Sequence, residues 1–179
     1  MNKKNKIKFF VEGFADKLLL DILEIPPKNI EKKGAVSKLE RSMKKQLKDF
    51  HKIIIGIIDY DKGKSLHFFE DFNFCDNPDN IILKHKDNSN QYIIFLKPKA
   101  IEKWLLDAAE SVNIKPENFN IPSDLKQFIK ITKHINISKN TDFINFIREI
   151  KKKKAEPFMF LQNILYTLTK GKTYPCKTN

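Results

Sequence analysis

Residues 53–63 read Ile-Ile-Ile-Gly-Ile-Ile-Asp-Tyr-Asp-Lys-Gly, an apolar and largely β-branched run that ends in two carboxylates and a glycine. A strand that is apolar on both faces is typical of a parallel sheet covered by helices on both sides. Asp59 and Asp61 follow this strand at its carboxyl end, where open α/β sheets bind their ligands. Two carboxylates at this spacing repel each other unless a proton or a cation lies between them, and Mg²⁺ prefers oxygen ligands. The stretch therefore predicts a buried strand with a metal site at its tip.

A second acidic strand end lies near the N-terminus. Residues 6–13 read Lys-Ile-Lys-Phe-Phe-Val-Glu-Gly, and residues 14–24 then carry a helical apolar pattern. If the two strands are parallel neighbours, their carboxyl ends meet at one edge of the sheet, and Glu12 lies beside Asp59 and Asp61. We therefore expect these three carboxylates to share one site for Mg²⁺ or Mn²⁺.

The rest of the first two thirds predicts alternating strands and helices, as in α/β folds. Two prolines at positions 26 and 27 end the first helix, because neither can continue it. The further elements that we expect are a weak strand at 29–33, a helix over 36–50, a short helix at 65–72, a loop at 73–80, a strand pair at 80–84 and 91–96, and a helix after Pro98. The predicted fold is α/β, a Rossmann-like sheet that is mainly parallel and flanked by helices.

The last third changes character and predicts only helices. We divide the chain into an α/β domain over residues 1–112 and a helical C-terminal extension over residues 113–179 that packs on it. Residues 113–122 contain two prolines and read as a connector. Three helices are expected at 123–134, 141–154 and 157–169, with Ser123 and Thr141 as N-caps, and residues 170–179 read as a frayed tail.

Composition indicates a globular protein with an affinity for polyanions. The chain has 179 residues, of which 41% are hydrophobic, which suits one ordinary core with a small appendage. Its formal net charge is +12, carried mostly by lysine, and such an excess favours nucleic acid through counterion release. A general enrichment in Lys, Ile and Asn would produce the same excess, so charge alone does not decide the partner.

Several classes of protein are disfavoured by motifs that the sequence lacks. Cys75 and Cys176 are far apart and form no Cys-x-x-Cys pair, which argues against a disulfide framework and against a zinc site. There is no signal-peptide pattern and no apolar run of membrane-spanning length, so we expect a soluble, cytoplasmic protein that binds no membrane. There is also no Gly-x-x-x-x-Gly-Lys loop, so any ATPase that this protein needs is a separate partner.

The acidic strand ends resemble a known family. Glu12-Gly13 after the first strand, followed about forty residues later by Asp59-x-Asp61-x-Gly63, resembles the Toprim domain. That domain occurs in type IA and type II topoisomerases, bacterial primases, recombination-mediator proteins and nucleases of the overcoming-lysogenisation-defect class. The resemblance covers roughly the first hundred residues. It implies that Glu12 serves as a general acid or base or as a shared metal ligand, and that Asp59 and Asp61 coordinate Mg²⁺.

Glu102 is a further catalytic candidate. It lies in Pro98-Lys-Ala-Ile-Glu-Lys-Trp104, where a helix begins directly after an apolar strand, so an acid in the first turn would face the same edge of the sheet. The helix macrodipole alone also favours Glu at this position. The stretch is similar to a Pro-x-x-x-Glu-x-Trp segment of small stand-alone Toprim-like proteins, some of which are linked to phage defence.

Together these features predict a metal-dependent nuclease that cleaves phosphodiester bonds in DNA or RNA, and the resemblance implies a role in bacterial defence or stress. One alternative is a non-catalytic Toprim-like module that binds nucleic acid or a partner ATPase. A second is a primase-like nucleotidyl transferase that uses the same carboxylates. A phosphatase with a catalytic Asp-x-Asp fits poorly, because that pair normally follows the first strand. The oligomeric state is left open.

Overall fold

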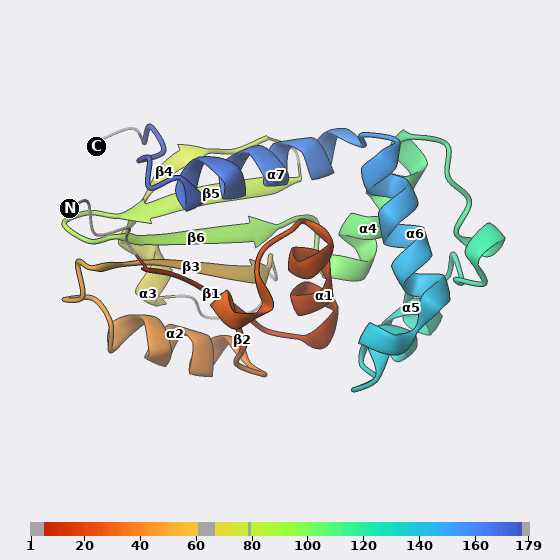
Figure 1. The fold of residues 1–179 in the computed structure, drawn as a ribbon, viewed down its shortest axis with the longest axis horizontal. Helices are drawn as coiled ribbons and strands as arrows, with labels where there is room; N and C mark the ends of the chain where they lie inside the picture. The colour runs from red at the N-terminus through yellow and green to blue at the C-terminus, as the bar shows by residue number, and fades with distance from the viewer. Residues whose placement is uncertain (1–5, 61–66, 79, 177–179) are drawn as a thin grey trace.

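The computed structural model describes residues 6–60, 67–78 and 80–176, and a six-stranded sheet forms its centre (Figure 1). The strand order is β2-β1-β3-β6-β5-β4. The strands are β1 (Lys6–Val11), β2 (Ile30–Lys32), β3 (Lys52–Asp59), β4 (Phe72–Asp76), β5 (Ile81–Lys86) and β6 (Gln91–Leu96). The first four in this order run parallel, and β5 and β4 are each antiparallel to the strand before them. The predicted α/β class with a mainly parallel sheet is confirmed.

Helices cover both faces of this sheet. The α-helices are α1 (Phe14–Ile22), α2 (Val36–Lys44), α3 (His67–Glu70), α4 (Ile101–Ser111), α5 (Leu125–Thr132), α6 (Thr141–Lys152) and α7 (Glu156–Thr169). Short 3₁₀ turns are η1 (Pro27–Asn29), η2 (Pro116–Phe119) and η3 (Ile137–Lys139). None of the described helices combines the length with the apolar character that crossing a membrane requires.

The side chains of β3 explain why it occupies the middle of the sheet. Successive residues of a strand point to opposite faces, and in β3 both sets are buried. Ile55 and Ile57 join the larger apolar cluster, which α1 and α4 to α7 complete, while Ile54 and Ile58 join the smaller one under α2 and α3. The helices of the last third thus share one core with the sheet. Within it, Trp104 of α4 stacks on Phe158 of α7 with ring centroids 5.0 Å apart.

Gly56 lets α2 lie close to the sheet. A Cβ atom there would lie 2.6 Å from Cδ1 of Ile93 and 2.9 Å from Sδ of Met43. Both atoms belong to flexible side chains and can shift at a cost. We expect Gly56→Ala to lower the free energy of unfolding by about 1–2 kcal/mol and Gly56→Val to lower it further, as overpacking does. Urea denaturation of the two variants tests this, and a Val variant no less stable than the Ala variant would contradict it.

The edge strand β4 corrects one prediction. Residues 73–80 were expected to form a loop, because Asn, Asp and Pro are frequent in turns. Instead the segment from Phe72 to Asp76 pairs antiparallel with β5, with an irregularity between Phe74 and Asp76. Backbone partners supplied by β5 outweigh the weak local preference, since strand propensity depends on neighbouring strands.

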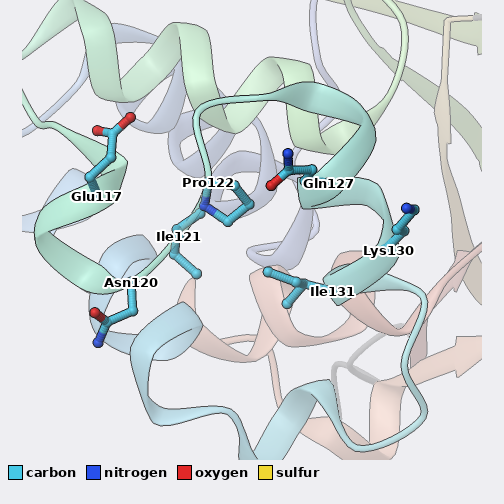
Figure 2. A pocket seen from close by; sticks show the side chains of 7 residues that line it. All are labelled: Glu117, Asn120, Ile121, Pro122, Gln127, Lys130 and Ile131. Atoms are coloured by element: carbon cyan, nitrogen blue, oxygen red, sulfur yellow. The ribbon is translucent and has the colours of Figure 1, made fainter.

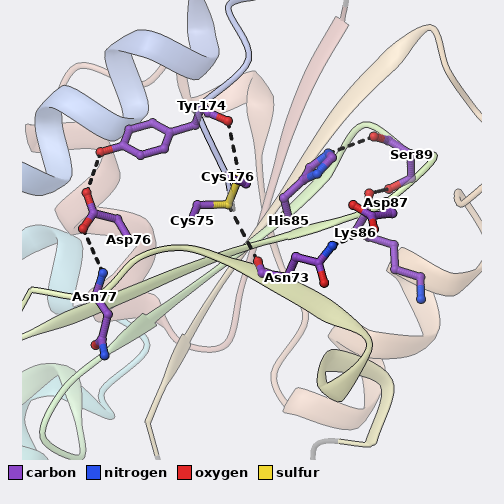
Figure 3. Close-up of a disulfide and its surroundings, with 10 residues drawn as sticks. All are labelled: Asn73, Cys75, Asp76, Asn77, His85, Lys86, Asp87, Ser89, Tyr174 and Cys176. Carbon is purple, nitrogen blue, oxygen red and sulfur yellow. Dashed lines mark hydrogen bonds between the residues drawn. A yellow bond between two sulfur atoms is a disulfide. The ribbon is translucent and has the colours of Figure 1, made fainter. Parts of the chain in front are cut away.

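The end of the chain corrects two more predictions. Cys75 of β4 and Cys176 form a disulfide across a sequence separation of 101 residues (Figure 3). Next to it the hydroxyl of Tyr174 donates a hydrogen bond to the Asp76 carboxylate at 3.0 Å. Burial, followed by this bond to Asp76, raises the pKa of Tyr174 to about 12. The described part of the tail is therefore tied to β4 and not frayed, because α7 returns the chain to the sheet edge, which the spacing of the two cysteines in sequence does not reveal.

Two helices begin one residue away from the predicted caps. At the start of α5, the side chain of Asp124, and not that of Ser123, accepts a hydrogen bond from the backbone N–H of Gln127. At α6 the side chain of Asn140, not of Thr141, accepts the corresponding N–H. In both cases the chain offered two adjacent capping residues, and propensity does not distinguish them.

Candidate active site

Glu12 and Asp59 meet at the carboxyl edge of the parallel sheet. Val11 of β1 is in register with Ile57 of β3, so the residues that follow the two strands emerge side by side. The backbone N–H of Asp59 donates to Oε2 of Glu12 at 3.4 Å. The expected proximity of these two acids is therefore observed. Asp61, the third predicted ligand, lies outside the described residues.

Glu102 reaches the same edge from α4. Leu96 at the end of β6 pairs with Asp59, which places the start of α4 beside the end of β3. The Glu102 side chain is buried and accepts a close hydrogen bond from the Thr132 hydroxyl, which also bonds to the carbonyl of Ile129 at 3.1 Å. Since Thr132 is the last residue of α5, the helical extension contributes directly to the wall of the site.

Asp16 is a fourth acid in this place, and sequence reasoning missed it. It lies in the first turn of α1, where its Oδ2 accepts the backbone N–H of Gly13 at 2.7 Å. The side chain is 5% exposed. A signal was present in the sequence, because Asp16 shares the helical stripe of Leu19 and Leu20, which are buried. An acid on the apolar face of a helix is costly unless it has a specific partner or task.

These acids line a pocket of about 250 Å³. Its acidic residues come from the turn after β1, from α1, from the end of β3 and from α4. Two lysines, Lys32 of β2 and Lys133 after α5, also line it. The residues around the pocket are Glu12, Gly13, Phe14, Ala15, Asp16, Lys32, Gly34, Asp59, Ile101, Glu102, Thr132 and Lys133. A pocket lined by both acids and lysines suits a phosphate ester that is bound partly through a cation.

Burial and mutual repulsion make two of the acids unusually weak. Burial, followed by the charges of Asp16, Glu12 and Glu102, raises the pKa of Asp59 to about 8, against a lowering hydrogen bond from the backbone of Ile101. Burial, followed by the charge of Glu12, raises the pKa of Asp16 to about 7, although the N–H of Gly13 lowers it. Without a cation the pocket therefore retains protons near neutral pH.

Two carboxylate oxygens of the pocket residues lack a hydrogen-bond partner among the described residues. Within the described part of the chain, Oδ1 of Asp16 and Oδ1 of Asp59 are buried and have no hydrogen-bond partner. Leaving such an atom unpaired costs about 1–3 kcal/mol. No group of three or more Asp, Glu, His or Cys side chains among the described residues is arranged to hold a metal ion. Mg²⁺ commonly takes only one or two carboxylates and completes its shell with water and phosphate oxygens, so the donors present fit it.

The hydroxyl of Thr132 should stabilise the fold through Glu102. In Thr132→Val the buried carboxylate loses its donor, and we expect the free energy of unfolding to fall by about 1–3 kcal/mol. Thr132→Ser keeps the donor and is the matched control. Urea denaturation at neutral pH measures both. Equal stability of the Val and Ser variants would show that the bond contributes nothing.

Comparison with known proteins adds no evidence beyond this geometry. The resemblance to the Toprim domain rests on Glu12, Gly13, Asp59 and Asp61, and the chemistry of the site rests on the placement of its carboxylates. No protein family, no curated protein and no solved structure matches this chain.

Proposed function

We propose that the protein is a metal-dependent nuclease that cleaves phosphodiester bonds at the pocket containing Glu12, Asp16, Asp59 and Glu102. One observation carries this proposal: buried acids from separate elements converge at the carboxyl edge of a parallel sheet, where two of their oxygens have no partner. Such an arrangement opposes folding, because the charges are desolvated and repel one another. Perturbed acids gathered in a pocket are typical of functional sites.

Asp16 and Asp59 are the residues best placed to hold Mg²⁺ or Mn²⁺, since each has an unpaired buried oxygen. The Toprim resemblance adds Asp61. A divalent ion bound here supplies Lewis-acid stabilisation to a phosphodiester oxygen. Glu102 is held by Thr132 within the wall and adds negative charge that favours a cation.

Glu12 is suited to the proton transfer. It is half-buried, and its Oε2 is oriented by the N–H of Asp59. A carboxylate at the mouth of a pocket can accept the proton of an attacking water as a general base. Lys32 and Lys133 lie where they can attract the substrate phosphate, and the net charge of +12 favours a polyanion in general.

A cleavage assay tests the proposal. DNA and RNA, each single-stranded and double-stranded, are incubated with Mg²⁺, with Mn²⁺ or with EDTA. We expect cleavage only with a divalent ion, and a loss of at least about 100-fold in Glu12→Gln, the usual size of a general-base effect. Glu110→Gln is the matched control, because Glu110 is exposed on α4.

Two results would refute a nuclease. One is cleavage that Glu12→Gln leaves unchanged. The other is tight nucleic-acid binding without turnover under any metal condition, which would favour the non-catalytic binding module.

A further inference from the structure

A row of lysines on α5 leads to the acidic pocket. Lys126, Lys130 and Lys133 are exposed and follow the spacing i, i+4, i+7, so they lie on one face of the helix. We call these three residues the α5 lysine row. The helix itself contains no acidic residue, and its N-cap Asp124 is engaged by the N–H of Gln127.

The charges of the α5 lysine row are not neutralised within the part of the chain that the structure describes. Several other lysines on helices pair with a neighbouring acid, such as Lys44 with Glu40 and Lys103 with Asp107. Among residues 6–60, 67–78 and 80–176, no ion pair involves any lysine of the row. An unpaired row of like charges on one helix face is costly to maintain and complements a polyanion.

The row is continuous with the site. Lys133 lines the acidic pocket together with Thr132, the last residue of α5. Lys32 from β2 lines it as well, and its Nζ lies 4.2 Å from the centroid of the Phe14 ring. A chain of phosphates that follows α5 would therefore arrive at the carboxylates.

A groove of about 730 Å³ runs beside the same helix (Figure 2). Gln127, Lys130 and Ile131 of α5 form one side of it, and the segment from η2 to Pro122 forms the other. Apolar surface from Pro122 and Ile131 is combined with the amides of Gln127 and Asn120, whereas Ile121 is buried in the core beneath them. Apolar contact with neighbouring amides is the combination that receives an unstacked base. Glu117 also lines the groove, and its carboxylate is engaged by the Ser123 hydroxyl.

We propose that a single strand of nucleic acid lies along α5, with phosphates on Lys126, Lys130 and Lys133 and a base in the groove beside Pro122 and Ile131. A single strand is required because a base in a duplex is stacked and paired. The strand enters the acidic pocket past Lys133. The cleavage that follows rests on the proposed function, whereas the binding does not.

Salt-dependent binding tests this inference. Single-stranded oligonucleotide binding is measured in EDTA over a range of salt concentrations for the wild type and for the triple variant K126Q/K130Q/K133Q. The slope of log affinity against log salt is negative, and it should become less steep by about 0.7 for each lost phosphate contact, and so by about 2 in the triple variant. At 0.1 M salt this corresponds to about a hundredfold weaker binding.

The matched control removes the same charge elsewhere. Lys45, Lys48 and Lys172 are exposed and lie far from α5 in sequence, and K45Q/K48Q/K172Q should keep most of the wild-type slope. If the two triple variants had equal slopes and were both as heat-stable as the wild type, the α5 lysine row would not be the phosphate-binding surface. If a duplex bound as tightly as a single strand and lost the same affinity in K126Q/K130Q/K133Q, the proposal that the ligand is single-stranded would be wrong.

The outcomes also separate this inference from the proposed function. Asp21→Asn should bind the strand as well as the wild type does, because the exposed Asp21 of α1 belongs neither to the row nor to the acidic pocket. Binding through the row without cleavage in Mg²⁺ or Mn²⁺ would refute the nuclease and support the strand site. Cleavage that persists with unaltered affinity in K126Q/K130Q/K133Q would support the nuclease and refute the strand site.

Discussion

Asp59→Asn should make the metal-free protein more stable while it abolishes the response to Mg²⁺. The Asp59 carboxyl is buried, and its ionised form is opposed by burial and by the charges of Asp16 and Glu12. Asparagine has nearly the same shape, can still accept a hydrogen bond from the backbone of Ile101, and carries no charge. We expect a gain of about 1–3 kcal/mol at pH 8, or about 2–4 °C in melting temperature for each kcal/mol.

The gain should depend on pH. Because the pKa of Asp59 is about 8 in the folded protein, its carboxyl is largely protonated at pH 5 and the charge is already absent there. Because the unfolded carboxyl ionises near pH 3.8, the difference in stability between the Asn variant and the wild type should grow from about pH 4 and be smaller at pH 5 than at pH 9. Thermal unfolding in EDTA at the two pH values measures this difference.

Adding metal should stabilise the wild type and leave the variant unchanged. A ligand present at 100 times its dissociation constant stabilises the folded state by about 2.7 kcal/mol. The wild type should gain this amount in Mg²⁺, whereas Asp59→Asn should gain none and should lose cleavage at least about a thousandfold. Asp21→Asn, an exposed acid on α1, should behave as the wild type. A variant that is less stable than the wild type and still responds to Mg²⁺ would mean that Asp59 has a structural role.

The second large effect is a loss of stability of the metal-free protein as the pH rises from about 4 to about 8. Asp16 and Asp59 have pKa values of about 7 and about 8 in the folded state, against 3.8 ordinarily. Between these values the folded state holds protons that the unfolded state has released. Since the folded state then binds more protons, the free energy of unfolding falls as the pH rises.

The size of this effect follows from linkage. Each group contributes at most about 1.4 kcal/mol per pH unit between its ordinary and its folded pKa, so the fall should amount to several kcal/mol, with about 10 kcal/mol as the upper limit for the two groups together. Below that window the trend reverses, because the pKa values of Glu24 and Asp49 are lowered by their lysine partners Lys151 and Lys52. The contribution of those pairs is lost as the pH falls through the folded pKa values of the two acids. Stability should therefore peak between the two trends, near pH 4.

Urea denaturation in EDTA at pH 5, 7 and 9 measures this profile. The double variant D16N/D59N should flatten the fall between pH 5 and pH 9, and Asp21→Asn should leave it unchanged. Saturating Mg²⁺ should also remove the fall, since the metal replaces the protons on the carboxylates. Stability that rises from pH 5 to pH 9 in EDTA would contradict the raised pKa values.

Local patterning was enough to predict the centre of the sheet and the position of its acids. The run at residues 53–59 is apolar on both faces, so it had to lie in the interior of the sheet. The parallel arrangement of β1 and β3 then placed Glu12 next to Asp59, because carboxyl ends of parallel strands share one edge. These inferences succeeded because burial of a strand depends on its own residues and on a general rule of α/β topology.

Only the tertiary structure decided which other groups complete the site and the sheet. Thr132 binds Glu102 across a sequence separation of 30 residues, and β4 becomes a strand only because β5 lies beside it. The bond between Cys75 and Cys176 depends likewise on where α7 returns the chain. Asp16 reads locally as a residue that caps a helix, and only the packing of α1 against the ends of β1 and β3 makes it part of an acidic pocket. Such contacts join segments whose separation in space is set by the whole fold, and no local pattern of residues encodes that distance.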